Sequence, residues 1–201
     1  MKIWQYATFL MLGSVLYGNA NADDDGPQYA REAVDVQNLQ EFGTGALTNG
    51  AVILTRDLKN RRLNADVTST DLMPGDAYSI WWVIFNFPRH CAEPYQCTGA
   101  DIMGSPKAKA SAIWGGGFLA DEFGDGNTSL GLVRGKTRRE VLVGSDVGLL
   151  NVRRAEIHVV LRTHGRAGVA GTVADQIGTA NEACPPEGCA NKFFSVHRAV
   201  E

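Results

Sequence analysis

The sequence lacks the features that assign a function directly. Its 19 lysine and arginine residues are outnumbered by 22 aspartate and glutamate residues, and no basic stripe gathers them. With a net charge of −3, the chain gives no electrostatic case for nucleic acid as a partner. It has no G-x-S-x-G or S-x-x-K motif for a serine nucleophile, and no H-x-H or H-x-x-x-H pair for a metal ion. We therefore expect the sequence to indicate fold and compartment more sharply than activity.

Long apolar runs are also missing, apart from one near the start. Lys2 is followed by an apolar stretch over residues 3–16 and then by Ala20-Asn21-Ala22. A basic start, a short apolar stretch and a small-x-small site are typical of a secretory signal peptide. The stretch is short for a bilayer span and is interrupted by polar residues, although a retained anchor is the alternative. We expect residues 1–22 to be a signal peptide cut after Ala22, and the mature chain to be secreted or periplasmic without a membrane-spanning segment.

Cysteine is scarce, with only Cys91, Cys97, Cys184 and Cys189 in the whole chain. An even number in an exported protein predicts disulfides, which would also remove thiolate catalysis. Three pairings are open, and the short spacings favour two local loops, Cys91–Cys97 and Cys184–Cys189. A zinc site built from all four cysteines is the alternative, although zinc ribbons favour C-x-x-C spacing.

Short apolar runs separated by turn signals are what the sequence has in quantity. Residues 51–55, 63–68 and 193–197 are typical of strands. Residues 78–87 are apolar at nearly every position, which predicts a central strand covered on both faces. Three glycines inside another apolar run, Gly115-Gly116-Gly117, predict a bulge or a close approach of two backbones.

This pattern predicts an all-β protein with a single domain. We expect an antiparallel β-sandwich over residues 43–201, with a barrel as the second choice. Residues 23–42 are expected to form an N-terminal arm. Tyr29, Ala33, Val36 and Leu39 recur at roughly helical spacing, so the arm is either a short helix or an irregular segment lying on the sheet.

One predicted strand, residues 155–163, carries most of the polar chemistry. Because side chains alternate across a strand, one face holds Ala155, Ile157, Val159 and Leu161 and is apolar. The opposite face holds Glu156, His158, Arg162 and, just beyond the strand, His164. His158 and His164 would lie on the order of 20 Å apart along a regular strand, so they cannot share one ion.

The last predicted strand could complete a compact site on that face. If it pairs with residues 155–163, His197 could lie beside His158 with Glu156 nearby, and His90 and Met103 could approach one end. Two histidines and a carboxylate suit copper, zinc or non-haem iron. We therefore take His158, His197 and Glu156 as candidate metal ligands, with His164 and Arg162 as separate candidates. The simpler interpretation is that each histidine has a structural role.

A hydrolase is the third function considered for this sequence. Ser195 lies two residues before His197 on the same predicted strand. We expect this spacing to present the hydroxyl poorly to the imidazole, so that no Ser/His/Asp arrangement can be assembled. Catalytic residues are therefore not assigned.

Three segments carry a resemblance to known proteins. They are YSIWWVIFN at residues 78–86, EIHVVLRTHG at residues 156–165 and CANKFFSVH at residues 189–197. Together they resemble a set of exported bacterial β-sandwich proteins without an established activity, and the chain is more distantly similar to chordin-type domains. The resemblance implies an exported binding or structural module of the bacterial envelope, with its partner unknown, and it implies no ligand or site residue.

Overall fold

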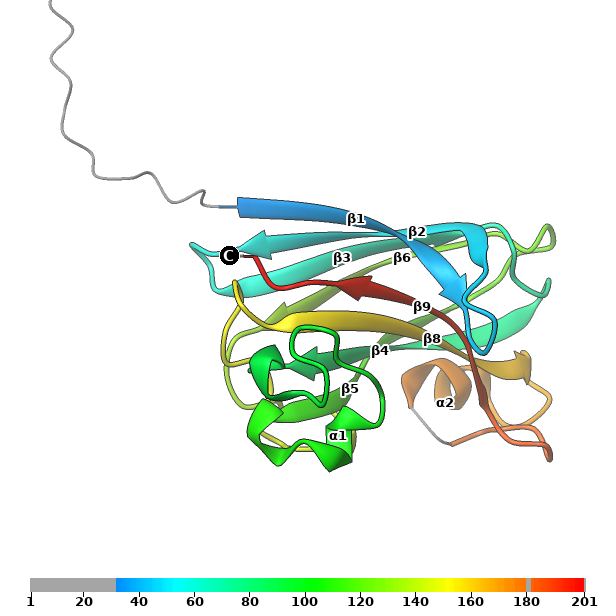
Figure 1. Cartoon of the computed structure of the whole chain (residues 1–201). Coiled ribbons are helices and arrows are strands. Elements are labelled where there is room, and N and C mark those ends of the chain that lie inside the picture. The colour runs from blue at the N-terminus through cyan, green and yellow to red at the C-terminus, as the bar shows by residue number, and fades with distance from the viewer. Residues whose placement is uncertain (1–31, 180–181, 201) are drawn as a thin grey trace, which may run out of the picture.

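The computed structural model describes residues 32–179 and 182–200, and these residues form mainly β-strands (Figure 1). The all-β class is thereby confirmed. The strands are β1 (Glu32–Glu41), β2 (Leu47–Asp57), β3 (Arg62–Ser69), β4 (Asp76–Phe85), β5 (Ala110–Leu119), β6 (Gly126–Val133), β7 (Val141–Gly144), β8 (Glu156–Arg166) and β9 (Ala190–His197). The short helices are η1 (Pro88–His90), α1 (Asp101–Gly104), η2 (Pro106–Ala108) and α2 (Val173–Gly178).

All nine strands belong to one antiparallel sheet in the order β6-β3-β2-β1-β9-β8-β4-β5-β7. The sheet curls into a half-barrel, and β5 contacts β6 across the interior although the two strands are far apart in the sheet order (Figure 1). The two packed layers expected of a sandwich are therefore two halves of one continuous curled sheet. β1 and β9 join the halves, but they pair only at Gln40↔Phe194 and Glu41↔Phe193.

The helix expected in the N-terminal arm is wrong for the described part of that arm. Residues 32–41 form β1, which pairs with β2 from Glu32↔Asp57 to Gln40↔Leu47. The apolar pattern of this segment is compatible with a helix and with a strand. Pairing with the backbone of β2 makes it a strand, because tertiary pairing overrides a weak local preference. β1 is thus part of the domain, while the predicted signal peptide and residues 23–31 lie outside the described residues.

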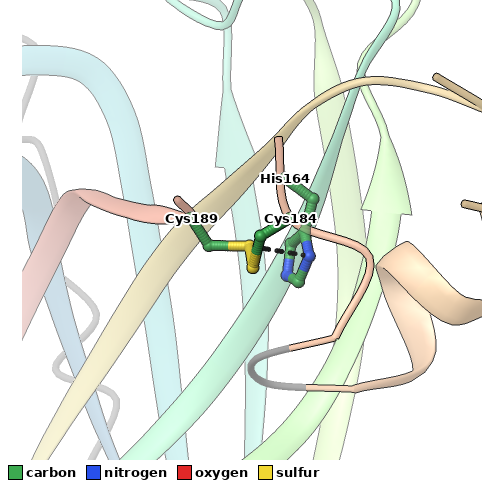
Figure 2. Close-up of side chains that lie close together, drawn as sticks. All are labelled: His164, Cys184 and Cys189. Carbon is green, nitrogen blue, oxygen red and sulfur yellow. Dashed lines mark hydrogen bonds between the residues drawn. A yellow bond between two sulfur atoms is a disulfide. The ribbon is translucent and has the colours of Figure 1, made fainter. Parts of the chain in front are cut away.

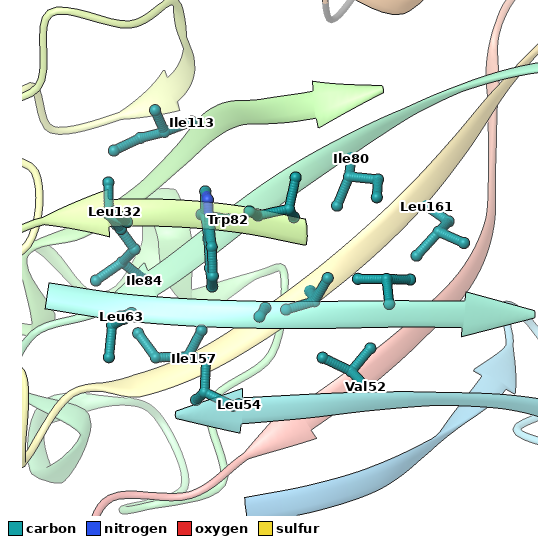
Figure 3. Close-up of a cluster of buried hydrophobic side chains, with 14 of the residues drawn as sticks. Val52, Leu54, Leu63, Ile80, Trp82, Ile84, Ile113, Leu132, Ile157 and Leu161 are labelled. Carbon is teal, nitrogen blue, oxygen red and sulfur yellow. The ribbon is translucent and has the colours of Figure 1, made fainter. Parts of the chain in front are cut away.

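Two apolar clusters lie on opposite faces of the sheet. The larger one fills the interior of the curl, and its buried side chains include Val52, Leu54, Leu63, Ile80, Trp82, Ile84, Ile113, Leu132, Ile157 and Leu161 (Figure 3). The smaller one lies on the outer face of β4, β5 and β8, and its members include Trp81, Val83, Phe85, Cys91, Cys97 and Val160. β4 therefore contributes to both clusters, and it lies between β5 and β8 as its apolar sequence predicts.

The glycine run in β5 produces both features that the sequence predicts for it. The register with β4 passes from Ile80↔Gly116 to Trp81↔Trp114, so Gly115 is the extra residue of a bulge. Gly117 lies directly under α2. A Cβ atom there would clash with the carbonyl oxygen of Ile177 and lie 2.7 Å from that of Tyr78.

We expect Gly117→Ala to lower the free energy of unfolding by about 2 kcal/mol, because both obstructing atoms are backbone and α2 would have to move. Gly131→Ala on β6 is the matched control. Its new Cβ would meet the end of the Arg62 side chain at 3.0 Å and Oδ1 of Asn64 at 3.8 Å, both in side chains, so we expect a change within about 0.5 kcal/mol. Urea denaturation of both variants measures the difference. A loss of stability in Gly117→Ala as small as that in Gly131→Ala would show that α2 moves away at little cost in free energy.

Both local disulfides form as the spacing predicts. Cys91 is bonded to Cys97 and Cys184 to Cys189, so the zinc site of four cysteines is wrong. Each disulfide closes a short loop, and each loop lies beside β8. Among the residues that the structure describes, no helix is long and apolar enough to cross a membrane.

Candidate functional site

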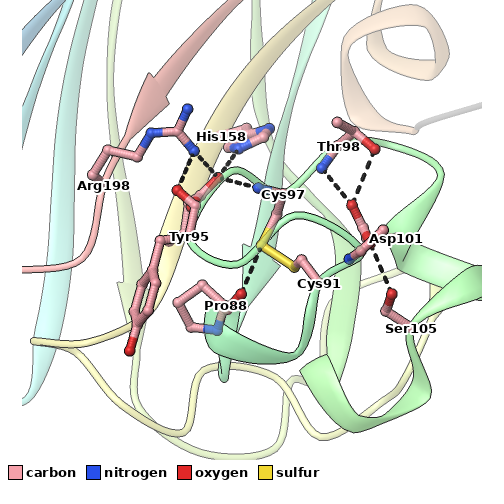
Figure 4. Close-up of a disulfide and its surroundings, with 11 residues drawn as sticks. Pro88, Cys91, Tyr95, Cys97, Thr98, Asp101, Ser105, His158 and Arg198 are labelled. Atoms are coloured by element: carbon pink, nitrogen blue, oxygen red, sulfur yellow. Dashed lines mark hydrogen bonds and ion pairs between the residues drawn. A yellow bond between two sulfur atoms is a disulfide. The ribbon is translucent and has the colours of Figure 1, made fainter.

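Glu156 is a fully buried carboxylate at the start of β8, on the outer face of the sheet. Its Oε1 atom accepts a hydrogen bond from Arg198 at 2.7 Å and from the backbone N–H of Cys97 at 3.1 Å (Figure 4). The same oxygen lies 2.8 Å from Nε2 of His158. The structure thus brings Glu156 and His158 together, as strand alternation requires.

This carboxylate joins three parts of the chain. The Cys91–Cys97 loop lies over it, and Arg198 also donates to the carbonyl oxygen of Tyr95 in that loop at 2.7 Å. Burying a carboxylate is costly unless charged or N–H donors surround it, and Oε1 has three such neighbours. Oε2 has no hydrogen-bond partner within the described part of the chain. The arrangement holds the loop and the C-terminal segment against β8.

The structure does not bring His158, His197 and Glu156 together as the predicted metal site requires. β8 and β9 do pair, but the register sets Ile157 opposite His197 and His158 opposite Val196. Residues directly opposite each other in an antiparallel pair share a face of the sheet. His197 therefore points into the interior with Ile157, while His158 points to the outer face with Glu156. The register differs by one residue from the one that would set His158 opposite His197, and this shift places the two histidines on opposite faces.

In the interior, His197 belongs to a different hydrogen-bonded set. Its Nδ1 lies 2.9 Å from Oδ2 of Asp35 on β1, and its Nε2 lies 3.1 Å from Oγ of Ser195. The hydroxyl of Ser195 thus lies within hydrogen-bond distance of the imidazole, although their spacing was expected to present it poorly. Asp35, His197 and Ser195 follow the order of donors and acceptors found in a serine hydrolase triad.

Burial gives this set a structural role. Ser195 and His197 have no exposed surface, so a substrate does not reach the hydroxyl. Burial lowers the pKa of His197 to about 4, with the nearby charge of Asp35 opposing the shift. The imidazole is thus neutral at pH 7, donates Nδ1–H to Asp35 and accepts from Ser195. These bonds connect β9 to β1 where their backbones do not pair.

A second histidine cluster lies where β8 meets the second disulfide loop. Nδ1 of His164 is 3.2 Å from Sγ of Cys189, and the possible ligand atoms of His164, Cys184 and Cys189 all lie within 4.8 Å of one another (Figure 2). Imidazole nitrogen and cysteine sulfur are common ligands of zinc and copper. These three residues could therefore hold a metal ion, although the two sulfurs are joined in a disulfide.

The His164 ring is fixed from both sides. Nε2 lies 2.8 Å from Oγ of Ser79, and this hydroxyl also accepts a hydrogen bond from Nε1 of Trp81 at 3.2 Å. Nδ1 lies 3.1 Å from the carbonyl oxygen of Glu182, which requires that Nδ1 carry the proton. Burial lowers the pKa of His164, so the ring is neutral near pH 7.

Sequence reasoning selected His164 but missed its partners. The missing signal was the register of β8 and β9, in which Thr163 is opposite Ala190. This pairing places Cys189, the residue before Ala190, next to His164. The sequence holds no local signal for this register, which also shifts at an irregularity between Leu161 and Arg162.

The remaining candidates are not brought into either cluster as ligands. Arg162 lies over the ring of Trp81, with 5.1 Å from its guanidinium carbon to the ring centroid, and donates to Asn191 at 3.1 Å. It covers the outer apolar cluster. His90 and Met103 are exposed, with Met103 at 71 %, and do not add copper ligands to Glu156 and His158.

One end of the half-barrel carries a cleft of about 380 Å³. Its lining combines apolar side chains with amides and two arginines: Asn86, Phe87, Pro88, Arg89, Tyr95, Asn151, Arg154, Ala199 and Val200. Asn86 fixes one wall, because it donates to the carbonyl oxygens of Lys109 and Gly148 and accepts from the N–H of Leu150. The cleft is therefore bordered by a rigid strand end and a disulfide-closed loop.

Comparison with known proteins adds no assignment to these sites. No family model, no curated protein and no solved structure matches the chain. The resemblance to exported bacterial proteins stays a prediction, and function has to be argued from the geometry.

Proposed function

We propose that this protein is an exported binding module of the bacterial envelope and that the cleft at the end of the half-barrel holds its ligand. The observation that carries the proposal is the cleft itself, an apolar hollow with charged residues at its rim. Binding sites are generally concave and mostly apolar, with a few polar groups that orient the ligand. The two disulfides support export, because such bonds persist in oxidising compartments.

The lining indicates the class of ligand. Phe87, Pro88 and Val200 offer an apolar wall, and Tyr95 offers an exposed aromatic ring. Arg89 and Arg154 are exposed, and neither forms a salt bridge to a described residue. Nε of Arg89 donates to Nε2 of His90 at 3.2 Å, so Arg154 is the better placed of the two to bind an anion in a bidentate manner. The proposed ligand therefore has an apolar or aromatic body and one carboxylate, sulfonate or phosphate group.

We expect an aromatic carboxylate such as naphthoate to bind the purified protein at least about tenfold more tightly than its uncharged amide, a difference of about 1.4 kcal/mol. Arg154→Gln should remove most of this preference because it removes the anion-binding group. Arg138→Gln is the matched control, since Arg138 is an exposed arginine outside the cleft lining. Calorimetric titration measures each affinity. Equal binding of acid and amide would contradict the proposed ligand class.

A second function, metal binding, is favoured by the cluster of His164, Cys184 and Cys189. We propose zinc or copper as the metal, because thiolate and imidazole ligands suit both. This site differs from the one expected from sequence, because the β8–β9 register places His158 and His197 on opposite faces of the sheet. Metal analysis of the purified protein under reducing conditions tests this function, and one bound ion per chain is the expected result.

A further inference from the structure

We propose that His164, Cys184 and Cys189 form a latent zinc site that becomes available when the Cys184–Cys189 disulfide is reduced. The inference rests on the metal-binding function proposed above and adds its control by the redox state of the two thiols. Three observations carry it: the short distances between the ligand atoms, the second hydrogen bond of His164, and the position of the disulfide at the end of two paired strands.

The disulfide is the state that excludes the metal. Thiolate is the form of cysteine that binds a metal ion, and a sulfur already bonded to another sulfur is a weak ligand. In the structure Sγ of Cys184 and Cys189 are bonded to each other. Nδ1 of His164 lies 3.1 Å from the carbonyl oxygen of Glu182, to which its N–H donates a hydrogen bond. In the oxidised chain all three ligand atoms thus have other partners, although they already lie close together.

Reduction would free the ligands without rearranging the strands. A dithiol reductant breaks the S–S bond with two electrons and two protons, and is itself oxidised to a disulfide. The two thiols then lose two protons as Zn²⁺ binds. Sulfurs about 2.3 Å from a tetrahedral zinc lie roughly 3.8 Å apart. The two sulfurs must therefore move apart by about 2 Å when zinc binds, and rotation of the two side chains allows this.

The surroundings of His164 suit a metal ligand. Metal-binding histidines generally donate their other ring N–H to a nearby acceptor, which fixes the ring and its tautomer. Oγ of Ser79 lies 2.8 Å from Nε2 and is held by Trp81. When Nδ1 binds the metal, Nε2 would carry the proton and its N–H would donate a hydrogen bond to Oγ of Ser79. The ring therefore needs only a change of tautomer, since it is buried and already in place.

Two thiolates and one imidazole also define what the metal can do. Zinc with three protein ligands keeps a fourth position for water, as in catalytic rather than structural sites. Soft sulfur ligands disfavour magnesium and calcium and admit Cu(I) as a competitor. Cys184 and Cys189 are half-buried, whereas Cys91 and Cys97 are each 5 % exposed. A reductant therefore reaches the second disulfide more readily than the first.

Zinc titration of the full mature chain tests the inference, with a chromophoric chelator as competitor. The protein is measured oxidised and after mild reduction, and alkylation followed by mass mapping verifies that only Cys184 and Cys189 are reduced. We expect one zinc per reduced chain, bound at least about 100-fold more tightly than to the oxidised chain. Co²⁺ in place of zinc should give a thiolate-to-metal absorption band in the reduced protein alone. His164→Gln should weaken binding, while the exposed control His90→Gln should not.

Zinc should also slow the alkylation of Cys184 and Cys189 in the reduced wild-type chain, a readout that needs no variant. Absence of zinc binding in the reduced protein would overturn both the metal-binding function and its control. Equal binding by the oxidised and reduced forms would overturn the redox control alone. Zinc binding that leaves both thiols as reactive as before would place the metal elsewhere and reject this site.

Discussion

Replacing Arg56 by methionine is expected to lower the free energy of unfolding by about 3 kcal/mol. Arg56 lies on the interior face of β2 and is 1 % exposed. Its guanidinium donates to the carbonyl oxygens of Val152 at 2.7 Å and Arg198 at 2.9 Å. Hydrogen bonds from a charged donor contribute about 1.5–3 kcal/mol each, and methionine would remove both, leaving the buried carbonyl of Val152 without this donor. Part of the loss is offset, because the variant no longer buries a charge.

Burial also lowers the pKa of Arg56 to about 10, so the side chain is still charged at neutral pH. Urea denaturation at pH 7 measures the stability of Arg56→Met, and Arg138→Met, at an exposed position, is the control. Hydrogen exchange adds a local readout, since residues 198–200 lose one of their anchors to β2. A variant as stable as the wild type would show that desolvation of the guanidinium cancels its hydrogen bonds.

Stability is expected to fall by about 3 kcal/mol as the pH is lowered from about 6.5 to about 4, owing to His197. In the folded chain its pKa is lowered to about 4, first by burial and then by the charges of Arg56 and His158, while Asp35 opposes the shift. The unfolded chain binds a proton near pH 6.5, and the folded chain does not until about pH 4. In this pH window the unfolded state therefore binds more protons than the folded state and is stabilised relative to it. Above this window His197 contributes no pH dependence.

Chemical denaturation at a series of pH values checks this prediction. His197→Gln should be less stable at pH 7 but should lose most of the dependence between pH 6.5 and 4. His90→Gln, at an exposed position, should keep the wild-type dependence. Some dependence should persist in His197→Gln, because burial also lowers the pKa of His164. An unchanged pH profile in His197→Gln would contradict a neutral, buried imidazole.

Particular residues show how far sequence reasoning reached toward the candidate sites. Strand alternation placed Glu156 beside His158 and separated both from His164, because those relations depend only on positions within one strand. It misjudged His197, since the face of a residue relative to a neighbouring strand depends on register, and a shift of one residue reverses it. It also missed the contact of His164 with Cys189, which depends on the same register.

By itself, the sequence determined the all-β class, the two local disulfides, the central place of β4 and the glycine bulge in β5. Each follows from apolar periodicity, from short cysteine spacing or from the absence of a side chain, and these act over a few residues. Only the tertiary structure decided that β1 is a strand, that both layers belong to one curled sheet, and which histidine meets which partner. Those outcomes depend on pairing between segments far apart in the chain, and local patterns carry no information about its register.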